Sequence, residues 1–384
     1  MSVLAPTCDQ VAERIQQDLD HIVSEVAHLH GVTSLILMGA FGRGEGSVIA
    51  VNGEIQPLND YDLMLVSESA EDLAEQVRIL STSLARELGM DFVDFDLVDP
   101  KRFVAAPPTI YYYDLKYGSR VLWGDPTVLD LLPDYRPEDI PLSEAIRLLL
   151  NRMAGILGGF LASRRGALGS QDYLYMRNQL VKAAVACGDA LIVGQHRHHH
   201  LYRERRQRLG ELRHSGALAF LQRDDLALID EGYAEKLSPT NQLDRDLWGW
   251  LHDLLPAYEK VFVHLVEVYT NNDSVLNVST AIEAYSRCHS RVSLRQRLHL
   301  PYRLARDRCW DRFYGVPHVQ RAYAALPLVL FSCPVHDFDP DKLRLSREML
   351  RSVARVRPGS DSLDWDLWEA HRSAALEAWE QLCH

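Results

Sequence analysis

Several features that mark other protein classes are missing from this 384-residue chain. It has no CxxC pair, and its six cysteines are scattered, which argues against a zinc site or a disulfide framework and favours a reducing environment. The most apolar helical stretch, 146–160, is interrupted by Arg147, Asn151 and Arg152, so no membrane helix is expected. The first residues also lack the pattern of a secretory signal. We therefore expect a cytoplasmic protein with no membrane partner.

Common catalytic and nucleotide-binding signatures are missing too. There is no GxSxG elbow for a serine hydrolase. The stretch GAFGRGEG, residues 39–46, fails the dinucleotide fingerprint because Ser47 stands where the third glycine belongs. It fails the Walker A pattern because Glu45, and not lysine, follows Gly44. The glycines must therefore serve a different kind of loop.

The charge pattern leaves one question open. The net charge is −12, which disfavours a protein that binds nucleic acid over its whole surface. Two segments, 197–214 and 287–312, are nonetheless rich in arginine. Such segments either meet phosphates or form solvated helix faces paired with acidic residues. The sequence does not decide between these roles.

The organisation of the chain changes near a group of prolines between residues 126 and 141. Before it, apolar periodicities predict helices and short strands in alternation; after it, nearly every periodic segment is helical. We expect an α+β protein: an N-terminal domain, 1–135, with a small mixed β-sheet flanked by helices, then an α-helical bundle domain, 136–384, with a possible subdivision near 272–316.

The expected elements follow from the spacing of apolar residues. In the N-terminal domain these are helices at 10–29 and 73–88, strands at 34–38, 61–66, 91–98 and 120–124, and a hairpin with an Asn52-Gly53 turn. In the helical domain they are helices at 142–163, 170–193, 201–222, 243–270, 276–298, 317–330, 340–355 and 363–383.

Acidic residues follow the glycine-rich loop on the next two strands. Asp60 and Asp62 are two residues apart, as are Asp94 and Asp96, so each pair is expected on one face of a strand. Carboxylates that converge from adjacent strands repel one another unless a cation lies between them. Hard oxygen ligands of this kind suit Mg²⁺, which also binds substrate phosphates.

This arrangement resembles the nucleotidyltransferase superfamily, the DNA polymerase β-like fold, over about residues 30–125. The family combines a strand, a glycine turn that opens a helix, an acidic-x-acidic pair on the next strand and a third acid on a later strand. Here these are Gly39, then Asp60 and Asp62, then Asp96 in DLVD. Two departures are Ala40, where the family usually has Ser or Gly, and the long insertion before Asp60.

The resemblance implies a role for each matching residue. Asp60, Asp62 and Asp96 would be catalytic and would bind two Mg²⁺ ions, with Asp94 as the alternative third acid. The remaining implied residues would contact the nucleotide: Gly39, Ala40, Gly42, Arg43, Gly44, Lys182 and Asp189. The last two lie seven residues apart on one face of a predicted bundle helix, a spacing that also suits a purely structural face.

The implied activity is transfer of a nucleoside monophosphate, expected to be AMP from ATP, to a hydroxyl group with release of pyrophosphate. A small-molecule acceptor is favoured, and a protein hydroxyl or an RNA end stays open. The alternative is a catalytically silent nucleotide sensor or scaffold on the same fold. Two other motifs have ordinary explanations: HRHHH, 196–200, as a solvated loop and not a metal site, and YYYD, 111–114, as aromatic packing and not a base-stacking surface.

Overall fold

The structure of the chain is a computed structural model. It describes residues 8–51, 54–57, 60–90, 93–166, 168–240, 244–290, 313, 315–356 and 364–383. Two compact units can be distinguished. Unit 1 comprises Met1–Pro141, Gln195–Glu211 and Tyr233–Gln242, and unit 2 comprises Leu142–Gly194, Leu212–Gly232 and Leu243–His384. The break after Pro141 lies close to the expected boundary at 135, but two later segments return to unit 1.

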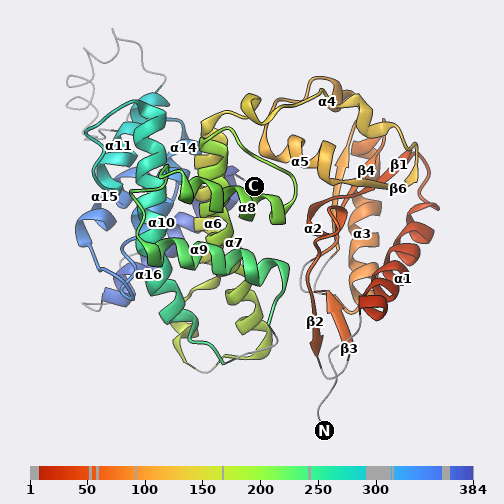
Figure 1. Cartoon of the computed structure of the whole chain (residues 1–384), viewed down its shortest axis with the longest axis horizontal. Coiled ribbons are helices and arrows are strands. Elements are labelled where there is room, and N and C mark those ends of the chain that lie inside the picture. The colour runs from red at the N-terminus through yellow and green to blue at the C-terminus, as the bar shows by residue number, and fades with distance from the viewer. Residues whose placement is uncertain are drawn as a thin grey trace. The chain divides into compact units, whose positions relative to one another are not determined.

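Unit 1 contains a mixed four-stranded sheet, which makes the protein α+β as expected. The strand order is β5-β4-β1-β6, with β4 and β5 parallel and the other pairs antiparallel. Its elements, shown in Figure 1, are α1 (Cys8–Val26), β1 (Ser34–Leu37), α2 (Gly39–Gly42), β4 (Asp62–Val66), α3 (Ala70–Leu88), β5 (Asp94–Val98), α4 (Lys101–Val104), α5 (Ile110–Gly118) and β6 (Arg120–Gly124). A separate hairpin joins β2 (Val48–Val51) to β3 (Glu54–Pro57).

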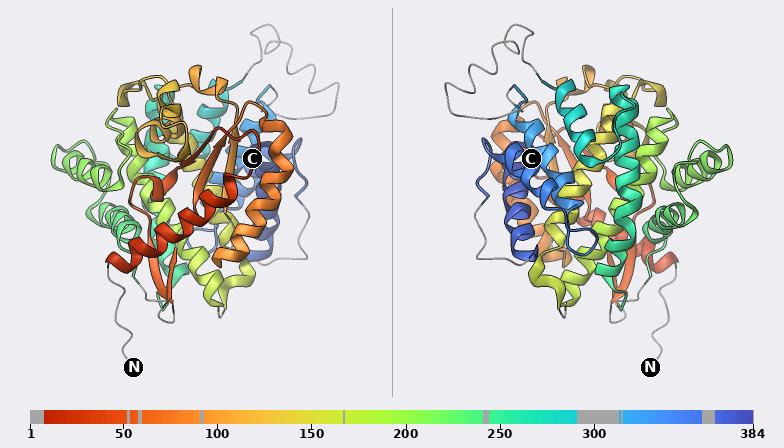
Figure 2. Two further views of the ribbon diagram at one scale, coloured as in Figure 1. Left: turned by 90° about the vertical axis from the view of Figure 1, so that its right-hand side faces the viewer. Right: turned by 90° about the vertical axis from the view of Figure 1, so that its left-hand side faces the viewer.

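Helices α1 and α3 lie side by side and cover one face of this sheet (Figure 2). Leu19 and Ile22 of α1 are buried against leucines that alternate along β1 and β4, among them Leu35 and Leu63. The apolar spacing of both helices therefore has the cause that the sequence indicates, which is burial of one stripe against the sheet. The opposite face of β4 and β5 is left to carry the acidic residues.

Unit 2 is helical. Its helices are α6 (Leu142–Gly159), α7 (Ser170–Gly194), α10 (Leu247–Thr270), α11 (Val278–Cys288), α14 (His318–Leu330), α15 (Pro340–Leu350) and α16 (Asp364–Cys383). Helices α8 (Tyr202–His214) and α9 (Arg223–Leu237) are divided, with residues 202–211 and 233–237 assigned to unit 1.

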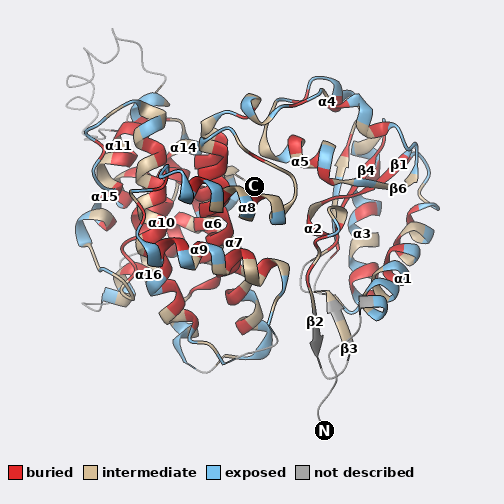
Figure 3. Ribbon diagram, in the orientation of Figure 1, coloured by how far each residue is buried: buried red, intermediate tan, exposed pale blue. Residues whose placement is uncertain are grey.

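The core of unit 2 lies around α6 and α7, which are buried along most of their length (Figure 3). Tyr258 of α10 donates a hydrogen bond to the Leu149 carbonyl of α6 over 2.8 Å, and the indole of Trp368 on α16 donates to the Val329 carbonyl of α14 over 2.9 Å. These bonds satisfy polar groups of large buried rings, as burial requires. The expected bundle is therefore confirmed as a set of packed helices.

Several expectations differ from the structure or fall outside it. Helix α9 is present although none is expected there, and the expected helix at 201–222 ends at His214. The Asn52-Gly53 turn and most of the arginine-rich segment 287–312 lie outside the described residues, as does much of the proposed subdivision at 272–316. Among the helices that the structure describes, none has the length and apolar character needed to span a membrane.

A buried histidine makes the stability of unit 2 sensitive to acid. His371 of α16 is 1% exposed, and its Nδ1 lies 2.7 Å from the Ser346 hydroxyl. Burial, with a smaller contribution from Arg347, lowers the pKa of His371 to about 4. Between this value and the ordinary value near 6.5, the unfolded chain binds a proton that the folded chain does not. Folding stability should therefore fall as the pH drops through this window, by at most about 1.4 kcal/mol per pH unit.

Denaturant unfolding at several pH values between 7 and 4 tests this expectation. The His371→Gln variant should show a flatter dependence than the wild type, whatever its stability at pH 7, because it lacks the titrating group. The exposed His28 offers a matched control, and His28→Gln should keep a steeper dependence than His371→Gln. Equal slopes for His371→Gln and the wild type would contradict the assignment.

Candidate functional site

Acidic side chains gather on one face of the sheet in unit 1. Because β4 and β5 are parallel and in register, Asp62 lies beside Asp94, and Met64 lies beside Asp96. Side chains alternate along a strand, so these four share a face, while the leucines of β4 point into the core. Neighbouring strands are about 4.8 Å apart, so the backbone positions that carry these three carboxylates lie side by side.

Asp60 lies just outside this strand. The ladder between β1 and β4 ends with the pair Leu37 and Leu63, and the Met38 amide then donates to the Asp62 carbonyl over 2.8 Å. Beyond Met38 the chain turns into α2, and β4 itself begins only at Asp62. Asp60 is therefore placed by the segment before β4, not by the strand itself as expected.

Gly39 is in close contact with Asp62. A Cβ atom built on Gly39 would lie 1.8 Å from Oδ2 of Asp62, a separation that no real side chain could occupy. The backbone φ of Gly39 is +60°, in the left-handed region that glycine tolerates best. Both facts require glycine at this position. The first residue of the loop and the second of the acidic pair, which the sequence associates only by pattern, are thus adjacent in space.

The rest of the loop is more constrained than its sequence indicates. Ala40 is 5% exposed, so its methyl group is part of the interior. The amide of Gly42 donates to the Met38 carbonyl over 2.8 Å, and that of Gly44 donates to the Phe41 carbonyl over 3.1 Å. Phosphate binding by these two amides would replace bonds inside the loop. The first amides of α2, at Gly39 and Ala40, start a helical turn, where N–H groups have no partner within the helix.

Tyr111 lies at this site, although the sequence does not indicate it. Thr109 caps α5 by accepting a hydrogen bond from the Tyr112 amide over 3.2 Å, so YYYD lies in the first turns of a helix. From this position the Tyr111 hydroxyl donates to Oδ2 of Asp96 over 2.7 Å. Partial burial, then the charge of Asp96 and its hydrogen bond, raise the pKa of Tyr111, and the charge of Asp62 adds to the effect. The hydroxyl is therefore protonated and is hydrogen-bonded to Asp96.

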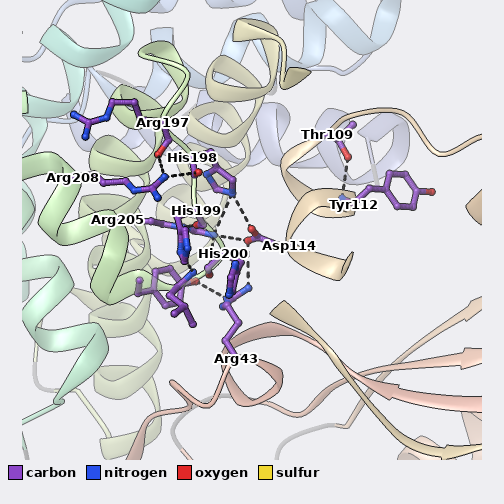
Figure 4. A network of polar contacts seen from close by, with 12 residues as sticks. Arg43, Thr109, Tyr112, Asp114, Arg197, His198, His199, His200, Arg205 and Arg208 are labelled. Atoms are coloured by element: carbon purple, nitrogen blue, oxygen red, sulfur yellow. Dashed lines mark hydrogen bonds and ion pairs between the residues drawn. The ribbon is translucent and has the colours of Figure 1, made fainter. Parts of the chain in front are cut away.

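A second polar group in unit 1 surrounds Asp114 of α5 (Figure 4). One oxygen of this carboxylate lies 2.6 Å from Nη2 of Arg205 and 3.3 Å from Nη1 of Arg43, and the other lies 2.8 Å from Nε2 of His198. The side chains of these three partners are at most 7% exposed. We call Asp114, Arg43, Arg205 and His198 the Asp114 network. It joins the glycine-rich loop to α5 and to segment 195–211.

The charges of this network determine the protonation of Asp114. Burial by itself would raise the pKa of the carboxyl, but the positive charges of Arg205, His198 and Arg43 outweigh it and hold the pKa well below its usual range. Arg43 also lies over the ring of Tyr202, with its guanidinium carbon 4.8 Å from the ring centroid. The predicted contact of Arg43 with a phosphate would require the guanidinium to leave these partners.

Glu45 ties the same loop to the start of α8. Its carboxylate accepts hydrogen bonds from the amides of Tyr202 and Arg203, over 2.6 and 3.2 Å, and from Nε of Arg203 over 2.9 Å. An acidic side chain at a helix N-terminus satisfies N–H groups and complements the helix dipole. GAFGRGEG is therefore held at both ends, by Asp62 at Gly39 and by α8 at Glu45.

The segment around HRHHH differs from the expected solvated loop. His198 has no exposed surface, because its ring is packed edge-on against Tyr113 and lies against the Asp114 carboxylate. The reason is not local: Asp114 on α5 supplies a charged partner that the neighbouring sequence does not contain. Paired arginines elsewhere in 197–214 agree with the solvated-face expectation, with Arg197 bound to Glu211.

Loss of the Asp114 charge should destabilise unit 1. Asp114→Asn keeps the volume of the side chain but leaves two buried guanidinium groups without their counter-ion, and we expect a loss of about 3 kcal/mol of folding stability at pH 7. Because the pKa of Asp114 is lowered, its contribution is complete above the ordinary carboxyl pKa and declines as the pH falls below about 4. The difference in free energy of unfolding between the wild type and the variant should therefore become smaller in acid.

Denaturant unfolding of both proteins at pH 7 and pH 3.5 measures this difference in stability. Asp134→Asn is the matched control, since Asp134 also pairs with a cation, Lys116, but its side chain is 93% exposed. The control should unfold close to the wild type, because exposed ion pairs contribute little. An Asp114→Asn protein as stable as the control would show that the network is not structural.

The residues predicted on the bundle helix belong to unit 2. Lys182 and Asp189 both lie on α7, Asp189 buried and Lys182 half-buried, and Arg177 is buried on the same helix. Helix α7 packs against α6 and α10. The shared face predicted for the two residues is compatible with this helix, and a nucleotide contact by either one stays a prediction.

The donor groups for a metal ion are oxygen atoms. No three His, Cys, Asp or Glu side chains in the described parts of the chain cluster tightly enough to hold an ion by themselves. Magnesium is usually bound by one or two carboxylates together with waters and substrate phosphates, not by an all-protein cage. The carboxylates on the acidic face of β4 and β5 are donors of this chemical type.

Comparisons with known proteins do not assign the chain to a family. No model of a known protein family matches the sequence, and no match is found among curated proteins. The function must therefore be inferred from the residues and their geometry.

Proposed function

We propose that this chain is a Mg²⁺-dependent nucleotidyltransferase, which moves a nucleoside monophosphate from an NTP, in our view ATP, to a hydroxyl group. The observation that carries the proposal is the contact of Gly39 with Asp62, where a Cβ would lie 1.8 Å from the carboxylate. It brings the opening turn of α2 against a face that also presents Asp94 and Asp96. Phosphate-binding and metal-binding groups are needed side by side in this chemistry.

The protein would bind the triphosphate at the beginning of α2. The amides of Gly39 and Ala40 are the first of that turn, and backbone N–H groups in such a position suit phosphate oxygens. Because Gly39 has no side chain, the Asp62 carboxylate lies against its backbone, and a phosphate bound at the first turn of α2 would lie beside that carboxylate. Ala40 then contributes through its amide, since its methyl group is buried.

The acids would hold the metal. Asp60, Asp62 and Asp96, or Asp94 in place of Asp96, are the carboxylates available for one or two Mg²⁺ ions once substrate phosphates complete the coordination. Bound there, Mg²⁺ would neutralise charge on the phosphates and acidify a bound hydroxyl. Such a site does not require three protein ligands in a closed cluster, and the described residues contain no such cluster.

Asp96 would take the proton of the acceptor. It already accepts a hydrogen bond from a hydroxyl, that of Tyr111, over 2.7 Å, which is the geometry required of a general base. The chain would otherwise contribute positioning and charge, because in-line transfer at phosphorus needs little covalent chemistry from the protein. A small molecule is the acceptor class that we favour, and a protein or RNA hydroxyl is the alternative outcome of the test.

A labelling experiment tests the proposal. The protein is incubated with Mg²⁺, a cell extract and each NTP labelled at the α-phosphate, and the small-molecule, protein and RNA fractions are separated. We expect label in one fraction that depends on the protein and is removed by EDTA. An absence of transfer with every NTP, despite nucleotide binding, would contradict the proposal and favour a sensor.

A further inference from the structure

The Tyr111 hydroxyl occupies the place that an acceptor would need. Among the described residues, it is a hydroxyl that the structure places on Asp96, at 2.7 Å from Oδ2. Tyr111 is 44% exposed, so solvent reaches this side chain. If Asp96 activates a hydroxyl, the nearest candidate is already part of the chain.

We propose that Tyr111 is itself an acceptor, and that the protein attaches a nucleoside monophosphate to its own Tyr111. This inference rests on the proposed function, because it requires an NTP at the same carboxylates. It assigns a modification site, which the transfer of nucleotide to an external acceptor does not require.

The reaction is balanced without any reagent beyond the NTP and Mg²⁺. The O–H bond of Tyr111 breaks and its proton passes to a carboxylate oxygen of Asp96. A new bond forms between the phenolic oxygen and the α-phosphorus, while the bond from that phosphorus to the oxygen bridging the β-phosphate breaks. Pyrophosphate leaves with the electron pair, and Tyr111 is left as a phosphodiester of the nucleoside.

Neighbouring tyrosines are differently placed. Tyr113 is 7% exposed and packs against His198, and the Tyr117 hydroxyl donates to the Tyr135 carbonyl over 3.0 Å. Tyr61 is fully buried and donates to Asp18 over 2.9 Å. The ring of Tyr112, next in sequence, contacts that of Tyr111 edge-on with centroids 5.2 Å apart, and Figure 4 shows it directed away from the Asp114 network. Selectivity for Tyr111 follows from its contact with Asp96.

Mass spectrometry of the purified protein tests the inference. After incubation with Mg²⁺ and ATP, and separately with the other NTPs, we expect one added nucleoside monophosphate per chain, mapped by peptide fragmentation to Tyr111. Tyr111→Phe should lose at least nine-tenths of the adduct, and Tyr112→Phe should keep it. Asp96→Asn should lose it as well, although Tyr111 is present. Circular dichroism of the variants checks that they are folded.

Failure of this inference can be told apart from failure of the proposed function. Label transferred to an extract fraction, with no adduct on the wild-type protein, would overturn self-modification and leave nucleotidyl transfer intact. An adduct that maps to another residue, or that persists in Tyr111→Phe, would also overturn it. No adduct and no transfer to any fraction would overturn both.

Discussion

The Asp62→Asn variant is expected to lose nucleotidyl transfer by roughly 10³-fold or more while remaining folded. Asparagine has nearly the same size and fits the space beside Gly39, but it removes the negative charge that the proposed Mg²⁺ site needs. Removing one of three close carboxylates also relieves repulsion, so we do not expect the variant to unfold more readily. Loss of activity without loss of stability is the distinctive result.

Rates of α-label transfer at saturating NTP, together with denaturant unfolding curves, measure both quantities. Glu75→Gln is a matched control: it removes one negative charge from unit 1, but its side chain lies on α3, 68% exposed and paired with Arg78. It should retain the wild-type rate. Comparison of Asp94→Asn with Asp96→Asn then decides which is the third acid. An Asp62→Asn protein with the wild-type rate would eliminate the mechanism.

Gly39→Ala should have the second large effect, on both folding and transfer. The new methyl group would meet Oδ2 of Asp62 at 1.8 Å, and the residue would also have to hold φ at +60°. The left-handed conformation alone costs about 1–2 kcal/mol for a residue with a side chain. The clash adds to this cost and moves the carboxylate, so we expect transfer to fall at least about 100-fold, as it does when reacting groups are displaced by an ångström.

Gly89→Ala separates these two causes. Gly89, the C-cap of α3, has a similar φ of +70°, but a Cβ built there meets nothing within 4 Å. This variant should carry the conformational cost alone and keep most of its transfer rate. Parallel measurement of unfolding and transfer for the two alanine variants distinguishes backbone strain from displacement of Asp62. Equal rates for both would show that the contact between Gly39 and Asp62 has no role in transfer.

Local patterns in the sequence are sufficient to predict much of the sheet. Strand β6 has the expected limits, and β1 and β4 differ from them by one residue. The runs of β1 and β4 are buried along nearly their whole length, and apolar runs this short favour a strand because a helix needs more residues. The acidic face follows as well, because alternation fixes the face that Asp94 and Asp96 share.

Helices α5 and α9 show where local reasoning fails. In α5 the aromatic residues of YYYD favour a strand over a helix, although Thr109 before them is a recognisable N-cap. In α9, Leu226, Ile229 and Tyr233 are buried at helical spacing, but charged residues surround them. Both signals are present in the sequence and are weaker than the propensities that oppose them.

The Asp114 network lies beyond any local pattern. Asp114 and Arg205 are 91 residues apart, and nothing near either one indicates that they meet. The same holds for Tyr111 and Asp96, which come from a helix and a strand with separate periodicities. The first contact depends on how segment 195–211 returns to unit 1, and the second on how α5 is placed relative to β5. Tertiary packing decides both, and the spacing of residues along the sequence does not.

The most direct test of nucleotidyl transfer is to follow both ends of the triphosphate in one reaction. Wild-type protein is incubated with Mg²⁺ and the accepting fraction, with ATP labelled at the α-phosphate in one sample and at the γ-phosphate in the other. We expect α-label on the acceptor and an equal amount of γ-label in pyrophosphate, with neither product formed by Asp62→Asn. Transfer of the γ-label to the acceptor, or its release as free phosphate, would contradict the proposed reaction.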